Sequence, residues 1–286
     1  MPTEAYNLVM PEKLSSCAVF ASPHSGRDYP AAFLDRSVLN YKTIRSSEDA
    51  FVDQLFDSAP RHGAPFLTAA MPRAYLDLNR NADELDPALI QGARRQGHNP
   101  RVASGLGVIP RVVANGRVIY NGKITMDEAR LRIDNYWRPY HACLKSLLSE
   151  AHQKFGQAIL IDCHSMPHEA VAISGTGQSK RPEIVLGDRF GASASGAIVD
   201  QIESAFASAG LNVARNTPFA GAYVTQTYGR PGRHQHAIQV EIDRSLYMDE
   251  ERIEPNQNFH AFRTLMDLVI SEIASIGSEP ARLAAE

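Results

Sequence analysis

The chain has 286 residues, of which 44% are hydrophobic, and it carries 32 acidic and 29 basic residues. A hydrophobic fraction of this size supports a folded core and excludes a disordered chain. The formal net charge is −3 and the two signs are interspersed, which argues against a basic surface for nucleic-acid binding but allows a local cationic pocket. No run of eighteen apolar residues occurs, which argues against a membrane-spanning helix. We therefore expect neither a nucleic-acid nor a membrane partner.

The cysteines and the first residues indicate the compartment. Cys17, Cys143 and Cys163 are sparse and unclustered, which fits a reducing environment. The amino-terminal stretch MPTEAYNLVMPEK is polar and lacks the apolar centre of a signal peptide. We expect a cytoplasmic protein. No linker-like stretch divides the sequence, so we expect a single domain over residues 1–286, and the oligomeric state is left open.

Apolar runs predict the first elements of the fold. Residues 17–21 (CAVFA) precede the loop sequence SPHSG, which indicates a buried strand followed by a loop. A serine-capped apolar stripe predicts a helix over residues 48–60. The stretches PFLTAA, residues 65–70, and AYLDLN, residues 74–79, are further strand candidates.

A hairpin and a long helix are predicted next. An Asn-Gly pair between two β-branched runs predicts a hairpin around residues 108–122. Thr125 and Glu128 form a capping box, and an apolar helical pattern follows it. Pro139 should kink or divide that helix, because proline has no N–H to donate.

The second half of the chain continues the alternation of strands and helices. The clearest segments are strands at 158–163 (AILIDC) and 237–242 (AIQVEI) and a helix at 193–209. This alternation predicts an α/β fold with a mixed or mainly parallel sheet. Ligands of such folds bind beyond the carboxyl ends of the strands, which is where both His24 and His164 are expected.

These two histidines are candidate metal ligands. Each could instead be a polar histidine bonded to nearby backbone, but two at one rim of a sheet favour a shared role. A catalytic zinc takes three protein ligands and keeps one position open. The third ligand would be Glu48 or Asp49, although Ser46-x-x-Asp49 is also a helix-capping pattern.

Two further positions carry groups suited to catalysis and to binding an anion. Alternation along strand 237–242 places Glu241 on its polar face, where a carboxylate can act as general base for a metal-activated water. Pairing with a nearby arginine is the alternative. Asn79 and Arg80 end the alternating stretch LDLNR, and a guanidinium binds a carboxylate through a planar two-point contact. A surface salt bridge is the alternative for Arg80.

The motifs together resemble the N-formylglutamate amidohydrolase (formylglutamate deformylase) family. The matching stretches occur in the family's order between residue 22 and about residue 250, and they are SPHSGRDYP, EDAFVDQLF, YLDLNR, YWRPYH, IDCHSMP, LGDRFG and NTPFAGAYVTQTYGRPGRHQHAIQVEIDRSLYMDE. The family is similar in fold to the zinc carboxypeptidases and aspartoacylase. The resemblance therefore implies a zinc-exopeptidase-like fold, three-layer αβα with a mixed, mainly parallel sheet.

The resemblance also implies roles for the matching residues. His24 and His164 match the two metal-ligating histidines, and Glu241 in QVEID matches the catalytic base. Asn79 and Arg80 match the Asn-Arg pair that binds the carboxylate of the substrate.

One position departs from the related peptidases. They have glutamate three residues after the first histidine, whereas this chain has Arg27. The carboxylate ligand must then come from EDAFVD, where the family pattern favours Asp49 and leaves Glu48 possible. The implied cofactor is a divalent metal, zinc first, with cobalt or another divalent ion as the alternative.

The activity implied is hydrolysis of the N-formyl amide of N-formyl-L-glutamate, or of a similar acidic N-acyl amino acid, to formate and the amino acid. Such a small-molecule substrate has two carboxylates and needs a second cation, for which Arg230 in a glycine-rich loop is our candidate. The alternatives are a carboxypeptidase-like or general N-acyl amino acid hydrolase on the same scaffold, and a non-catalytic binding protein.

Overall fold

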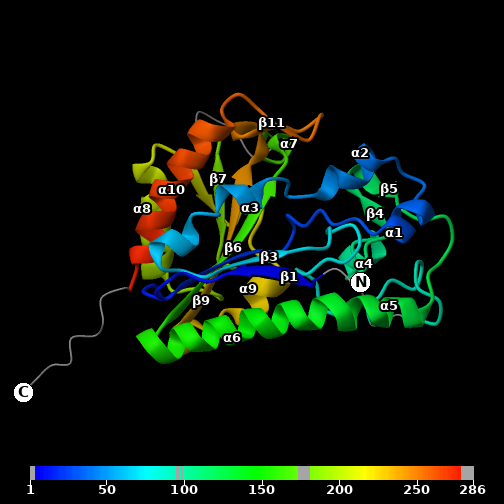
Figure 1. The fold of residues 1–286 in the computed structure, drawn as a ribbon, viewed down its shortest axis with the longest axis horizontal. Coiled ribbons are helices and arrows are strands. Elements are labelled where there is room, and N and C mark those ends of the chain that lie inside the picture. The colour runs from blue at the N-terminus through cyan, green and yellow to red at the C-terminus, as the bar shows by residue number, and fades with distance from the viewer. Residues whose placement is uncertain (1–3, 95–96, 98, 173–180, 278–286) are drawn as a thin grey trace, which may run out of the picture. The chain divides into compact units, whose positions relative to one another are not determined.

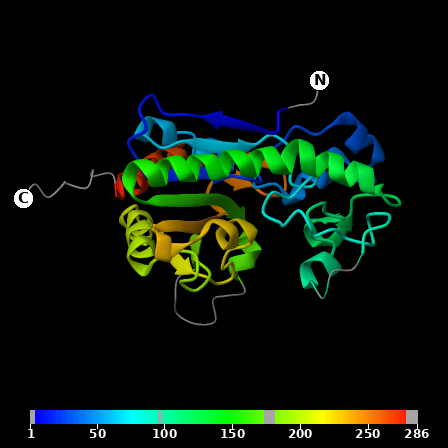
Figure 2. The same cartoon turned by 90° about the horizontal axis from the view of Figure 1, so that it is seen from below.

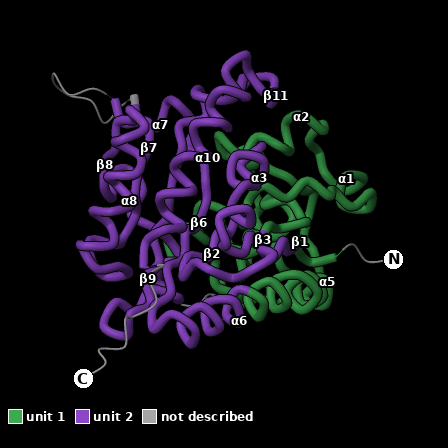
Figure 3. The backbone as a smooth tube through the Cα atoms, turned by 60° about the vertical axis from the view of Figure 1, so that its left-hand side comes forward, with its two compact units in different colours: residues 1–7, 23–50, 68–143 green, residues 8–22, 51–67, 144–286 purple. Residues whose placement is uncertain are grey.

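A computed structural model describes residues 4–94, 97, 99–172 and 181–277 (Figure 1). The chain divides into two compact units, each assembled from separated segments (Figure 3). The first comprises Met1–Asn7, Pro23–Ala50 and Thr68–Cys143, and the second comprises Leu8–Ser22, Phe51–Leu67 and Leu144–Glu286. The single domain expected from the sequence stays a prediction.

The main sheet has seven strands in the order β1-β3-β2-β6-β9-β7-β8. In that order the strands are Tyr6–Val9, Phe66–Ala69, Ala18–Ser22, Ala158–Met166, Gln235–Asp243, Ile184–Gly187 and Val213–Arg215. The pairs β2–β6, β6–β9 and β7–β8 are parallel, and β7–β9 is antiparallel. The predicted α/β fold with a mixed sheet is therefore confirmed.

Helices flank this sheet (Figures 1 and 2). Strands β2 and β7 are buried along their whole length, as expected of apolar strands covered on both faces. Helix α10 (Phe259–Ser275) packs on α8 (Gly196–Ser208) and on α3 (Val52–Leu55). The short helix α9 (Tyr223–Tyr228) contacts β6 and β9. Among the described residues, no helix combines the length and the apolar character needed to cross a membrane.

The remaining elements are short, apart from one long helix. The helices are α1 Ala31–Arg36, α2 Tyr41–Ile44, α4 Pro100–Ala103, α5 Met126–Arg132, α6 Arg138–Phe155 and α7 His168–Ala172. Single 3₁₀ turns lie at Arg45–Ser47, Ala59–His62, Ala114–Gly116, Pro231–Arg233 and Arg244–Leu246. Two small antiparallel pairs join β4 (Val112–Val113) to β5 (Arg117–Val118) and β10 (Met248–Asp249) to β11 (Glu254–Pro255).

The predicted hairpin and capping box are both present. Strands β4 and β5 pair around a turn in which Asn115 has a φ of 60°, the left-handed conformation that asparagine tolerates. The Thr125 hydroxyl accepts the Glu128 N–H at 3.1 Å at the start of α5. A π-helical segment, Ile133–Trp137, separates α5 from α6, and Pro139 is the second residue of α6. The expected break near this proline therefore takes the form of a π-helix.

The helix expected over residues 48–60 is wrong in its extent. Only α3 and the 3₁₀ turn Ala59–His62 are helical there, and Glu48 and Asp49 precede both. Phe51 has a φ of 66°, a left-handed conformation that interrupts any helix that would begin at Glu48. The Asp49 N–H donates to the His24 carbonyl at 3.1 Å, so a contact distant in sequence replaces the expected cap.

The strand expected over residues 74–79 is also wrong. The N–H groups of Tyr75 and Leu76 both donate to the Pro72 carbonyl, which makes a tight turn at the start of this stretch. Its alternating pattern reflects a buried, irregular segment in which Leu76 and Leu78 are 1% and 2% exposed.

Candidate metal centre and active site

Three neighbouring parallel strands bring the first candidate residues to one end of the sheet. In the register of β2 with β6, Ala21 pairs with Asp162, and His24 lies two residues beyond the end of β2. In the register of β6 with β9, His164 pairs directly with Glu241. His164 lies inside β6, which continues to Met166, whereas the sequence analysis placed it just after a strand.

His24, Asp49 and His164 form a buried group. Each offers a ligand atom, and the three atoms lie within 4.8 Å of one another. The exposed fractions of the three residues are 1%, 1% and 2%. The His24 Nδ1 atom is 3.4 Å from Asp49 Oδ2. Two imidazoles and one carboxylate are a donor set that zinc and similar divalent ions take.

Each histidine of this group also contacts a second carboxylate. His24 Nε2 lies 2.7 Å from Asp77 Oδ1, and His164 Nε2 lies 3.1 Å from Asp162 Oδ2. Metal-ligating histidines commonly donate their other N–H to a carboxylate, which fixes the tautomer and the orientation of the ring. The arrangement around both histidines therefore fits a metal centre. Neither aspartate was assigned a role from the sequence, although the Asp162-x-His164 spacing puts both side chains on one face of β6.

Asp77 is held as a carboxylate. Its burial would raise its pKa, but the positive charge of Arg73, the contact with His24 and the charge of Arg80 hold that pKa well below its ordinary value. Arg73 Nε is 3.0 Å from Asp77 Oδ2 and Arg80 Nε is 4.0 Å from the same oxygen. An ionised Asp77 can accept the Nε2–H of His24, so the Nδ1 atom is the nitrogen with a lone pair for a metal.

Glu48 is engaged by other residues. Arg45 donates from Nη2 to Glu48 Oε2 at 3.0 Å, and the Tyr29 hydroxyl donates to Oε1 at 2.5 Å. Burial raises the pKa of Tyr29, and the adjacent Glu48 charge raises it further, so this hydroxyl stays protonated. Glu48 is thus neutralised by Arg45, whereas its neighbour Asp49 belongs to the buried group.

Glu241 lies on the polar face of β9, as its alternation predicts. It is 7% exposed, and Gln239 on the same face donates from Nε2 to Glu241 Oε1 at 2.7 Å. The backbone of Glu241 is paired with His164 on one side and with Val185 on the other. A carboxylate fixed in this way beside a candidate ligand has the position that a general base requires.

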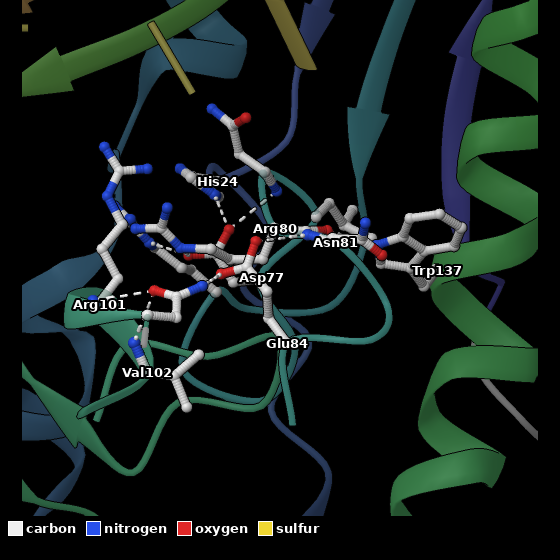
Figure 4. A network of polar contacts seen from close by, with 12 residues as sticks. His24, Asp77, Arg80, Asn81, Glu84, Arg101, Val102 and Trp137 are labelled. Atoms are coloured by element: carbon white, nitrogen blue, oxygen red, sulfur yellow. Dashed lines mark hydrogen bonds and ion pairs between the residues drawn. The ribbon is translucent and has the colours of Figure 1, made fainter. Parts of the chain in front are cut away.

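Asn79 and Arg80 follow Asp77 in the same irregular segment. Figure 4 shows Asp77 and Arg80 within one network of polar contacts. The Asn79 N–H donates to Asp77 Oδ1 at 2.8 Å. Arg80 is 6% exposed, and its Nε atom makes no hydrogen bond. Burial lowers the Arg80 pKa most, and the nearby charges of Arg101 and Arg73 lower it further. A buried guanidinium among other cations is an electrostatically favourable place for a carboxylate of a ligand.

Arg230 lies at the amino-terminal end of β9. Its backbone forms a bridge with Gln235, the first residue of β9, so six residues of extended strand separate that bridge from Glu241. Six residues of strand span roughly 20 Å, which is more than an arginine side chain reaches. The guanidinium instead donates to the carbonyls of Gln226 and Gly229 at 2.9 and 2.5 Å. The glycine-rich loop therefore places Arg230 at the other end of β9 from Glu241, and its role as the second cation stays a prediction.

The chain is similar to known proteins of one family. Residues 16–248 match the family model of N-formylglutamate amidohydrolase. The chain is 31% identical to an N-formylglutamate deformylase of Pseudomonas putida over 81% of this chain and 82% of the relative. It is 30% identical to an N-formylglutamate deformylase of Pseudomonas aeruginosa over 82% of each chain. A solved structure of an N-formylglutamate amidohydrolase from Ralstonia eutropha JMP134 superposes with a TM-score of 0.88 at 35% identity, covering 95% of this chain and 97% of the other.

Proposed function

The chain belongs to the N-formylglutamate amidohydrolase family, and we propose that it uses a divalent metal to hydrolyse N-formyl-L-glutamate to formate and glutamate. The observation that carries the metal dependence is the buried group of His24, Asp49 and His164. The absence of disulfides at Cys17, Cys143 and Cys163 is compatible with the cytoplasmic location that we propose.

We assign His24, Asp49 and His164 as the ligands. Glu48 is the weaker candidate because Arg45 already neutralises it. Zinc suits two nitrogens and one oxygen, and cobalt or another divalent ion would also suit them. When bound, the metal would polarise the formyl carbonyl and acidify an attacking water.

Glu241 supplies the proton transfers. Its carboxylate removes a proton from the water that attacks the formyl carbon, and it then returns that proton to the amide nitrogen as the C–N bond breaks. The hydrogen bond from Gln239 Nε2 to Glu241 Oε1 holds this carboxylate in place on the polar face of β9. The products, formate and a free amine, balance the atoms of substrate and water.

Arg80 and Asn79 bind a carboxylate of the substrate in this proposal. Arg80 is buried, so a carboxylate lying against it is shielded from water and the charge-assisted contact is strong. For the second carboxylate we now favour Arg101 or Arg73, because the charges of both act on Arg80. An enzyme with a net charge of −3 can bind a dianion through such a local group of cations.

Substrate selectivity tests this function. We expect kcat/KM for N-formyl-L-glutamate to exceed that for N-formyl-L-leucine by ~100-fold or more, because a site built for a polar group strongly disfavours its absence. Arg80→Lys keeps the charge but loses the two-point contact, and it should cost most of kcat/KM for formylglutamate. Steady-state formate release from both compounds measures each value.

Arg230→Lys is the matched control, and we expect it to leave both rates unchanged. Equal rates on formyl-leucine and formylglutamate would identify a general N-acyl amino acid hydrolase. Rapid cleavage of a carboxyl-terminal peptide bond would instead identify a carboxypeptidase-like enzyme. Binding without turnover of any of these compounds would indicate a non-catalytic protein.

A further inference from the structure

Two aromatic side chains on one helical face hold the backbone of the segment that contains Asn79 and Arg80. Trp137 donates from Nε1 to the Arg80 carbonyl at 2.9 Å (Figure 4), and His141 Nε2 lies 2.9 Å from the Leu78 carbonyl. Trp137 and His141 are four residues apart, so they share a face of the helix. Their rings are in contact, with centroids 4.1 Å apart. The pair therefore acts on alternate carbonyls of one short segment.

The conformation of residues 76–80 depends on hydrogen bonds from outside the segment. Residues 76–80 belong to no helix or strand, and their buried carbonyls need hydrogen-bond donors from elsewhere. Within the segment the Asp77 carboxylate accepts the Asn79 N–H, while Trp137 and His141 donate to the segment's carbonyls from the helix. The direction of the Arg80 side chain follows from the position of this backbone.

The helical backbone and the protonation state of His141 both favour these two hydrogen bonds. Trp137 ends the π-helical segment Ile133–Trp137, and a π-helix inserts a residue that rotates the following side chains. Burial lowers the pKa of His141 to about 4, so its imidazole is neutral at pH 7 and has one N–H. The Leu78 carbonyl, which can only accept, fixes that N–H on Nε2.

We propose that Trp137 and His141 are positioning residues that hold Arg80 in the orientation that binds a substrate carboxylate. This inference rests on the proposed function, because it assigns the role of Arg80 in binding formylglutamate. Both residues bond to the backbone of the segment that carries Arg80, so they should affect binding of substrate more than its conversion.

Measuring KM and kcat of Trp137 and His141 variants distinguishes a positioning role from a general effect on folding. Trp137→Phe and His141→Leu each remove a donor and keep a side chain of related size. We expect each to raise KM for formylglutamate by about 5- to 10-fold, the scale of one lost hydrogen bond, with kcat changed less than about 2-fold. His141→Gln keeps an N–H at a similar distance from the backbone and should restore KM. Metal content should stay that of the unmodified protein.

The matched control is on the same helix. His152 Nε2 lies 2.8 Å from the Arg233 carbonyl, which is the same kind of bond in a different place. His152→Leu should leave KM and kcat unchanged. A fall in kcat at constant KM in Trp137→Phe, or no rescue by His141→Gln, would overturn the inference.

A second readout needs no turnover. Trp137 is the sole tryptophan of the chain, so intrinsic tryptophan fluorescence reports on the group bonded to the Arg80 carbonyl. Titration with glutamate should change that fluorescence saturably in the unmodified protein and not in Arg80→Ala. No change in the unmodified protein would contradict the inference. If the unmodified protein fails to hydrolyse formylglutamate, the proposed function is wrong, and the fluorescence titration still decides whether Trp137 reports on Arg80.

Discussion

Replacing Glu241 by glutamine is expected to lower kcat for formylglutamate at least ~100-fold, the lower end of the usual contribution of a general base. Glutamine has nearly the same shape, but its amide cannot take a proton from water. The backbone of β9 and its pairing with His164 are unaffected by the change, so metal content should be retained. Steady-state formate release combined with metal analysis measures both quantities.

Glu251→Gln is the control for this experiment, because Glu251 is an exposed glutamate of the same unit. It should leave kcat unchanged. Near-normal turnover in Glu241→Gln would mean that another group accepts the proton. Loss of metal in Glu241→Gln would mean that Glu241 contributes to the metal centre.

The candidate ligands are expected to hold the metal jointly. His24→Ala, His164→Ala and Asp49→Ala should each lose stoichiometric metal, because two remaining ligands bind a divalent ion far less tightly than three. Glu48→Gln should keep the metal, since Glu48 lies against Arg45 and Tyr29. Elemental analysis of the purified variants measures the stoichiometry, and circular dichroism verifies that each is folded.

The pattern of losses identifies the carboxylate ligand. If Glu48→Gln loses the metal and Asp49→Ala retains it, the assignment of Asp49 is wrong. Retention of metal by both histidine variants would exclude the proposed centre altogether.

The central strands β2 and β6 could be predicted because their local sequences indicate buried strands without reference to the rest of the chain. The runs CAVFA and AILIDC are apolar and bounded by turn signals, and both form buried parallel strands, β2 and β6. The Asn-Gly pair and the Thr125 capping box are local signals, and local hydrogen bonds suffice to produce the hairpin and the start of α5.

Elements that depend on distant contacts could not be predicted. Ser46-x-x-Asp49 satisfies the rule for a helix start, yet the Asp49 N–H is taken by the carbonyl of His24, twenty-five residues away in sequence. Strand β1 (Tyr6–Val9) was not predicted, since its exposed edge position leaves little apolar pattern. Residues 74–79 have the alternating pattern of a strand, but the N–H groups of Tyr75 and Leu76 form a turn with the Pro72 carbonyl.

The same distinction applies to the candidate site. His24, His164 and Glu241 are recognisable because each is a polar residue within two positions of the carboxyl end of an apolar strand. The contacts of Asp77 with His24 and of Trp137 with Arg80 link segments that are 53 and 57 residues apart, and no spacing rule relates them. Arg230 comes five residues before the first residue of β9, whereas Glu241 lies near the carboxyl end of that strand.

The central claim is metal-dependent deformylation, and removal and return of the metal test it most directly. Formate release from N-formyl-L-glutamate is measured for the protein as purified, after dialysis against a chelator, and after addition of zinc or cobalt to the dialysed protein. We predict activity in the first sample, its loss in the second and its recovery in the third. Unchanged formate release by protein shown to be free of metal would contradict the account.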